Sequence, residues 1–172
     1  MTRSLITLTL VAVLALQACS DRKGKNYNKV NDDGKEFVNG ASESGAAEIK
    51  FSELALQNSQ NKEVKAFAKA IIADHTEEAK ELTDIAEKGK FKTVDSLSDE
   101  DNQHLTSLST KTGVAFDKEY LQIMVHEHEQ TIKFFKENST NASAKLQAFT
   151  TKNLPKLQAH LKEANAICTG LK

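Results

Sequence analysis

The chain has 172 residues, with 23 Lys and Arg against 24 Asp and Glu, which gives a formal net charge of −1. This balance argues against nucleic acid as a partner, because nucleic-acid binding calls for a strongly basic face. The two cysteines, Cys19 and Cys168, provide no disulfide framework, so the packed core of a single domain must hold the fold.

The first residues, MTRSLITLTLVAVLALQACS, have the features of a secretory signal. Arg3 supplies the positive charge, and the apolar run that follows is too short to span a bilayer, which takes about 20 residues. The end of the run, LQAC, resembles the bacterial lipoprotein cleavage motif, which we favour over an ordinary signal peptide with a chance cysteine near its cut site. We therefore expect a signal peptide over residues 1–18, a lipid on Cys19 that attaches the protein to a membrane, and export to the outer membrane or periplasm.

The next segment, residues 19–35, is polar and contains glycine, which predicts a flexible tether before a domain over residues 36–168. Within that domain the apolar residues recur at helical spacing and show no strand-like alternation. The predicted helices lie over about residues 33–59, 61–88, 113–138 and 141–168.

The lengths of the links predict how these helices are arranged. Short links join the first helix to the second and the third to the fourth, so each pair should be antiparallel neighbours. The link over residues 90–112 is long, and Ser98 with Asp101 predicts a capped short helix inside it. Pro155 either kinks the last helix or follows a new start capped by Asn153. The prediction is an all-α protein, an antiparallel four-helix bundle with a short helix between its second and third helices.

Three of the five histidines interrupt the apolar stripes. His75, His128 and His160 lie near the middle of three different helices, and Glu48 is the acid at similar height on the stripe of the first helix. Because mid-helix positions meet in an antiparallel bundle, these four side chains could converge and bind one divalent transition-metal ion, such as zinc, iron, copper or nickel. The alternative is that they satisfy one another as polar core residues.

The other ionisable residues near these histidines are interpreted as solvent-facing. His104 lies in the long link, and His126 shares a helix face with polar residues. Glu78 and Glu163 each follow a stripe histidine by three residues, which places a carboxylate beside each imidazole. They could support the histidines from outside the cluster, but we favour the interpretation that both are surface acids. Cys168 is either a small buried residue or a free thiol.

Three stretches of the chain resemble a bacterial family, the domain-of-unknown-function family 4142. They are GAAEIKFSELALQNSQNKEVKAFAKAIIADHTEEAKEL, GVAFDKEYLQIMVHEHEQTIKFF and LQAFTTKNLPKLQAHLKEA. The matching family positions are Glu48, His75, Asp117, Tyr120, His128, Pro155 and His160. The resemblance implies a ferritin-like bundle that is exported and often lipid-anchored, and it supplies no activity.

One departure limits the type of metal centre. Di-iron sites of ferritin-like proteins use Glu-x-x-His pairs, whereas Ile72, Val125 and Leu157 stand three residues before the stripe histidines here. A mononuclear histidine-rich site is therefore expected in place of a carboxylate-bridged iron pair.

We interpret the protein as a lipid-anchored helical bundle of the cell envelope that binds a metal ion or an envelope protein. The sequence contains no nucleophile elbow, Gly-rich phosphate loop or cysteine cluster, so no catalytic residue is assigned. One alternative is a mononuclear metalloenzyme in which Glu48 is a ligand or general base. The other is a purely structural envelope protein whose histidines fix the helix register.

Overall fold

The computed structural model describes residues 30–138 and 143–171. The predicted signal peptide, Cys19 and the first part of the predicted tether lie outside the described residues. Within residues 30–35, Val30 is buried in the core and α1 already begins at Asp32, so this end of the predicted tether is part of the bundle.

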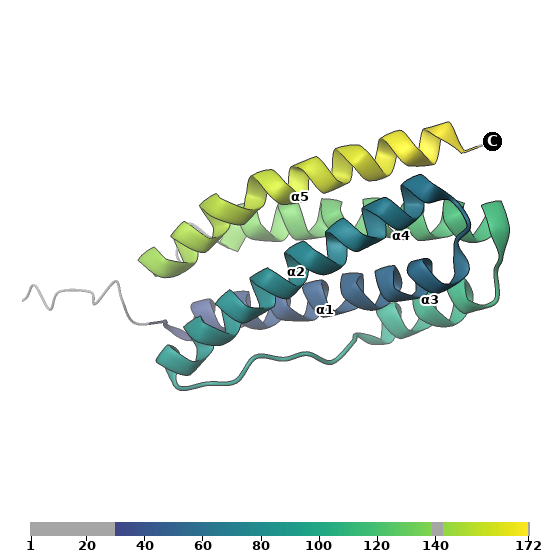
Figure 1. The fold of residues 1–172 in the computed structure, drawn as a ribbon. Helices are drawn as coiled ribbons and strands as arrows, with labels where there is room; N and C mark the ends of the chain where they lie inside the picture. The colour runs from purple at the N-terminus through teal and green to yellow at the C-terminus, as the bar shows by residue number, and fades with distance from the viewer. Residues whose placement is uncertain (1–29, 139–142, 172) are drawn as a thin grey trace, which may run out of the picture.

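The described residues form five helices and no strand, which confirms the all-α prediction (Figure 1). The four long helices are α1 (Asp32–Asn58), α2 (Lys62–Gly89), α4 (Gly113–Asn138) and α5 (Ala144–Gly170), and the short one is α3 (Asp99–Ser109). The start of α3 has the predicted capping box, in which the side chains of Ser98 and Asp101 each accept a hydrogen bond from the other's backbone N–H. No described helix combines the length and the apolar character needed to cross a membrane.

The last helix passes through its proline without interruption. Pro155 lies inside α5, and Asn153 is fully buried within the same helix. A new helix start capped by Asn153 is therefore wrong, because the packing of α5 against its neighbours keeps the helix continuous despite the missing backbone N–H.

All neighbouring long helices run antiparallel. The α1–α2 and α4–α5 hairpins pack against each other through α1 with α4 and α2 with α5. Ser44 of α1 pairs with Thr131 of α4 while Ser52 pairs with Tyr120, so α4 runs opposite to α1. Consequently α2 and α4 are parallel, and the link over residues 90–112 returns along the bundle with α3 against α1 and α4 (Figure 1). This single long crossover is characteristic of ferritin-like bundles.

A polar layer divides the apolar core into two clusters. The first cluster contains Phe51 of α1, Phe67 of α2 and Met124 of α4, and the second contains Phe37, Leu82 and Phe135 of the same three helices. On α2, α4 and α5 the residues between the two clusters include His75, His128 and His160. The stripe histidines therefore lie at a common level of the bundle.

Candidate metal centre

The polar layer brings together one ionisable side chain from each long helix. Glu48 and His128 are fully buried, His75 is 2% exposed and His160 is 5% exposed. The three imidazole rings lie 5.3 to 6.0 Å apart between centroids. Each histidine offers one ring nitrogen, and these nitrogens lie within 4.8 Å of one another. The predicted convergence of the histidines is therefore present, and together they could hold a metal ion.

Glu48 borders this cluster through one carboxylate oxygen. Its Oε2 atom lies 2.9 Å from His75 Nε2 and 3.4 Å from His128 Nε2. None of these three buried atoms has a partner in hydrogen-bonding geometry. The other oxygen, Oε1, accepts a hydrogen bond of 3.3 Å from Ser44 Oγ, which fixes the carboxylate from the α1 side.

In each imidazole, one ring nitrogen contacts an oxygen outside the cluster. The contacts are His75 Nδ1 to Glu78 Oε2 at 3.1 Å, His128 Nδ1 to the Met124 carbonyl at 2.8 Å, and His160 Nε2 to Asp74 Oδ2 at 3.0 Å. The opposite nitrogens, Nε2 of His75 and His128 and Nδ1 of His160, are buried without a hydrogen bond. Metal-binding histidines have this arrangement, in which a carboxylate or carbonyl holds one nitrogen and the other is free for the ion.

Charge attraction sets the protonation of the metal-free layer. Burial alone would raise the pKa of Glu48, but His128 and His75 hold it at about 2. Burial alone would lower the pKa of His75, but Glu48 and Glu78 raise it to about 10, whereas burial keeps the pKa of His128 below its usual value. At neutral pH Glu48 and His75 therefore form an ion pair beside a neutral His128, and an ion that binds His75 must displace its proton.

Two residues predicted to face solvent are partly or wholly buried. Glu78 is only 6% exposed and contacts His75, because its three-residue spacing places it on the same inward face of α2. His104 is half-buried, with its ring edge-on to Phe51 and its Nε2 atom shielded from solvent. The surface prediction for Glu78 was wrong, because its face of α2 points into the bundle, and that for His104 was wrong in part, because its side chain, 33% exposed, packs its ring from α3 against Phe51.

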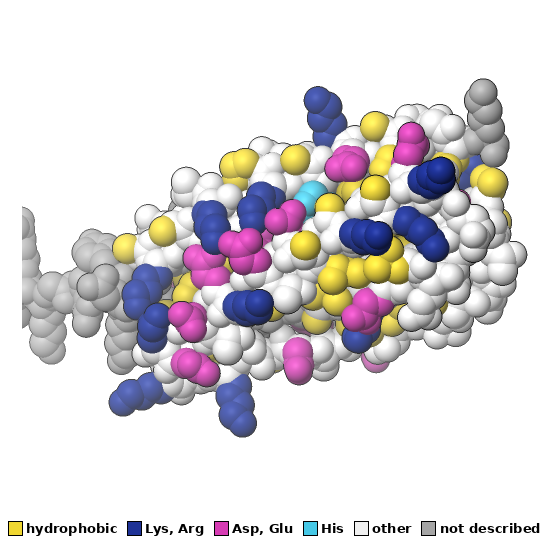
Figure 2. Space-filling view, in the orientation of Figure 1, with side chains coloured by type: hydrophobic (Ala, Val, Ile, Leu, Met, Phe, Trp, Pro, Cys, Tyr) yellow, Lys and Arg dark blue, Asp and Glu magenta, His cyan; other side chains and the backbone are white. Residues whose placement is uncertain are grey.

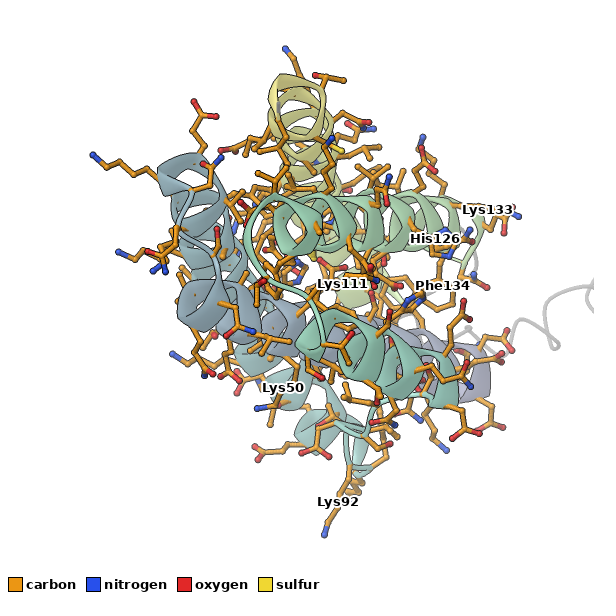
Figure 3. The ribbon with its side chains drawn as sticks, turned by 90° about the vertical axis from the view of Figure 1, so that its right-hand side faces the viewer. Lys50, Lys92, Lys111, His126, Lys133 and Phe134 are labelled. Atoms are coloured by element: carbon orange, nitrogen blue, oxygen red, sulfur yellow. The ribbon has the colours of Figure 1, made fainter. Side chains whose placement is uncertain are left out.

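Two further surface predictions are confirmed. His126 and Glu163 are exposed, and Figure 3 shows His126 on the outer side of α4. Cys168 is a half-buried free thiol near the end of α5, between the two alternatives left open by the sequence. Asp74, the partner of His160, was missed, because it directly precedes His75 and adjacent helical residues point in different directions.

Comparison with known proteins agrees with the sequence resemblance. The model of a family described as a domain of unknown function (DUF4142) matches residues 20–167. No curated protein matches the chain.

Similar solved structures share the helical fold. A DUF305 fragment from Deinococcus radiodurans has 13% identity and a TM-score of 0.76, and the match covers 83% of this chain and 99% of that chain. CopM in an Ag-bound form has 20% identity and a TM-score of 0.68, covering 79% and 95% of the two chains. CopM in a Cu(II)-bound form has 19% identity and a TM-score of 0.71, covering 80% and 97%. At these identities the likeness is one of fold alone.

Proposed function

The chain belongs to the DUF4142 family, and we propose that its bundle binds one transition-metal ion between His75, His128 and His160. The observation that carries the proposal is that each histidine, on its own helix, has a buried ring nitrogen that meets no protein partner beyond the Glu48 carboxylate. An unsatisfied buried polar group costs about 1–3 kcal/mol, so His128 Nε2 and His160 Nδ1 need a partner that they can share with His75 Nε2, which the Glu48 carboxylate already attracts. A metal ion would satisfy all three at once.

We assign Glu48 as the fourth ligand. Its Oε2 atom already lies within 3.4 Å of two of the histidines, and its charge offsets part of the charge of a cation. Three imidazole nitrogens and one carboxylate oxygen form a ligand set that suits zinc or copper. Copper is the first ion to test, because it binds nitrogen ligands most strongly in the divalent series and because CopM, which shares the fold, has Ag-bound and Cu(II)-bound forms.

The burial of the layer favours binding over catalysis. A metalloenzyme needs an open coordination position and a path for its substrate. Here none of the four residues is more than 5% exposed. The protein is therefore proposed to hold its ion in a closed bundle centre, and no catalytic residue is assigned.

Export and lipid attachment belong to the same proposal. The LQAC sequence and the apolar run before it support cleavage ahead of Cys19 and a lipid on its thiol. The metal-binding bundle would then be held at a membrane of the cell envelope. An envelope protein as a further partner stays a prediction from the sequence.

The test is the metal content of the protein purified without a histidine tag. Residues 20–172, which include every described residue, are equilibrated with copper, zinc, iron or nickel, desalted and analysed by elemental mass spectrometry. We expect about one ion per chain, and its loss in the His128→Leu and His160→Leu variants, because each removes a ligand. Both variants keep the Glu48–His75 ion pair, and circular dichroism checks that they remain helical.

His126→Leu is the matched control, because it removes an exposed histidine from α4 only two residues from His128. This control should retain the ion. A folded wild-type protein that retains none of the four metals would overturn the proposal and favour the structural alternative.

A further inference from the structure

The three imidazoles differ in the ring nitrogen that contacts an oxygen outside the cluster. His75 and His128 make this contact through Nδ1 and place Nε2 beside Glu48, whereas His160 makes it through Nε2 and leaves Nδ1 buried without a hydrogen bond. A neutral imidazole carries one proton, so the contact to an acceptor decides which nitrogen has the lone pair. The tautomer of His160 therefore depends on the residue that contacts Nε2.

That residue, Asp74, lies at the surface, unlike the other outer partners. Its side chain is 32% exposed, whereas that of Glu78 is 7% exposed and Met124 is fully buried. Asp74 belongs to α2 and His160 to α5, so their contact crosses the seam between these two helices. Figure 2 shows acidic and basic side chains side by side on this face of the molecule.

The Asp74 carboxylate is held from two sides. Oδ2 lies 3.0 Å from His160 Nε2, and Oδ1 accepts a hydrogen bond of 3.2 Å from Lys156 Nζ. Lys156 lies one turn before His160 on α5, so the lysine and the histidine both approach Asp74 from the same helix. These two contacts fix the carboxylate against the imidazole.

We propose that Asp74 is a positioning residue of the metal centre. Its carboxylate accepts a hydrogen bond from the Nε2–H of His160, so that Nδ1 stays unprotonated and faces the other two imidazoles. An ionised carboxylate is only an acceptor, so the nitrogen facing it must be the protonated one. Without Asp74 the ring could carry its proton on Nδ1, which would then block the ion. The metal role rests on the proposed function, whereas the tautomer is a property of the metal-free protein.

Glu77 provides a matched control on the same surface. It lies one turn after Asp74 on α2, and its carboxylate contacts Lys152 and Lys156 at 3.2 and 3.7 Å. No contact joins Glu77 to any of the three imidazoles among the described residues. Glu77→Gln therefore removes a surface charge from the seam and keeps the direct contact between Asp74 and His160.

The first measurement is the tautomer of His160 in the metal-free protein. Long-range ¹H–¹⁵N correlation spectra are recorded for residues 20–172 at pH 8, above the usual pKa of histidine. The His160 signals are identified by their loss in His160→Gln. We expect the Nε2–H tautomer in the wild type and in Glu77→Gln, and a mixture in Asp74→Leu. An Nδ1–H tautomer in the wild type would overturn the proposal.

The second measurement is the affinity for Cu(II), determined by competition with a chelator. Loss of a residue that orients a ligand typically weakens metal binding roughly 10- to 100-fold, which we expect for Asp74→Leu. Asp74→Asn should lose less, because its amide oxygen can still accept the hydrogen bond. Glu77→Gln should stay within about twofold of the wild type.

These two measurements separate this inference from the proposed function. Equal losses in Asp74→Leu and Glu77→Gln would show a general charge effect and would overturn the positioning role. A wild type that binds no Cu(II) would count against copper binding, while the tautomer would still decide the role of Asp74. Asp74 is partly exposed, so its variants should fold, and circular dichroism checks this.

Discussion

At the scale of single residues, the charge of Glu48 decides the protonation of the imidazoles around it. The carboxylate is fully buried, yet its pKa is held at about 2 by His128 and His75 against the effect of burial. In return it contributes to the rise of the His75 pKa to about 10. The metal-free protein therefore contains a buried ion pair, whose contribution to stability depends on pH.

The first prediction concerns the alkaline side of the stability profile. The pKa of His75 rises from 6.5 to about 10 on folding, so its contribution is complete below pH 6.5 and is lost as the pH rises toward 10. We expect the free energy of unfolding of the metal-free protein to fall between pH 7 and about pH 9.5, measured by urea unfolding in a chelator. Glu48→Gln removes the charge that supports the shift, so its profile should be flatter.

His128 does not disturb this comparison. Burial lowers its pKa below the usual value of 6.5, so it is neutral in both states throughout the alkaline range. Parallel profiles for the wild type and Glu48→Gln would show that the ion pair does not form in the folded protein.

The convergence of four side chains could be predicted from the sequence, because it depends only on their helix face and their height along the bundle. Glu48, His75, His128 and His160 each interrupt an apolar stripe near mid-helix, and antiparallel packing brings such positions together. Asp74 could not be predicted in this way, because its partner lies across the α2–α5 seam and depends on the rotation of both helices. The three-residue spacing of Glu78 from His75 indicated that both lie on the same face of the helix. We gave more weight to the usual preference of glutamate for solvent, and so did not predict that Glu78 is buried.

At the scale of elements, two glycines of α1 have different surroundings. A Cβ atom on Gly40 would lie 2.8 Å from the ring of Phe134, whereas one on Gly45 would lie 3.5 Å from His75 Nδ1, an ordinary contact distance. Phe134 stacks on Phe37 with ring centroids 5.5 Å apart. Gly40 therefore allows an aromatic ring of α4 to approach α1 closely, and Gly45 leaves room for a methyl group.

The second prediction follows from this difference. Gly45→Ala should raise the free energy of unfolding by about 0.5–1 kcal/mol, because alanine has the higher helix propensity and meets no clash. Gly40→Ala should gain less or lose stability, because the ring of Phe134 must move. Thermal unfolding of both variants in the metal-free state tests the pair. A destabilised Gly45→Ala would mean that the methyl group displaces His75.

The start of α3 could be predicted from neighbouring residues, whereas the course of α5 could not. Ser98 and Asp101 form the predicted capping box of α3, because such a cap depends only on residues three apart. The course of α5 through Pro155 was not decided by the sequence, since it depends on packing against neighbouring helices.

At the scale of the whole molecule, the polar layer divides the core at a cost to stability. Both apolar clusters contain phenylalanine side chains from α1 and α4. The layer between them contains buried ionisable groups, which cost free energy to remove from water. The lengths of the short links predicted the antiparallel pairing of α1 with α2 and of α4 with α5. The sequence could not show that the buried polar groups form a continuous layer, since this requires the register of all four helices.

The third prediction tests whether this layer is present for binding. Replacing Glu48, His75, Glu78, His128 and His160 together by leucine removes the buried charges along with the ligands. Exchange of buried ion pairs for apolar residues of similar volume is often neutral or stabilises by about 1–4 kcal/mol, so the variant should unfold at a higher denaturant concentration than the metal-free wild type. It should show no response to Cu(II). The wild type should gain stability with the metal, by about 2.7 kcal/mol at a free concentration of 100 times its dissociation constant.

The comparison uses chemical unfolding of both proteins in chelator and in buffered Cu(II). A leucine variant less stable than the metal-free wild type would mean that the polar layer itself holds the helices together, as a structural role requires. A wild type whose unfolding does not respond to Cu(II) would contradict copper binding. We expect the wild type to be less stable than the leucine variant in chelator and to gain stability in Cu(II), whereas the variant should not respond. This result would mean that the buried polar layer lowers the stability of the metal-free protein and is present because it binds the ion.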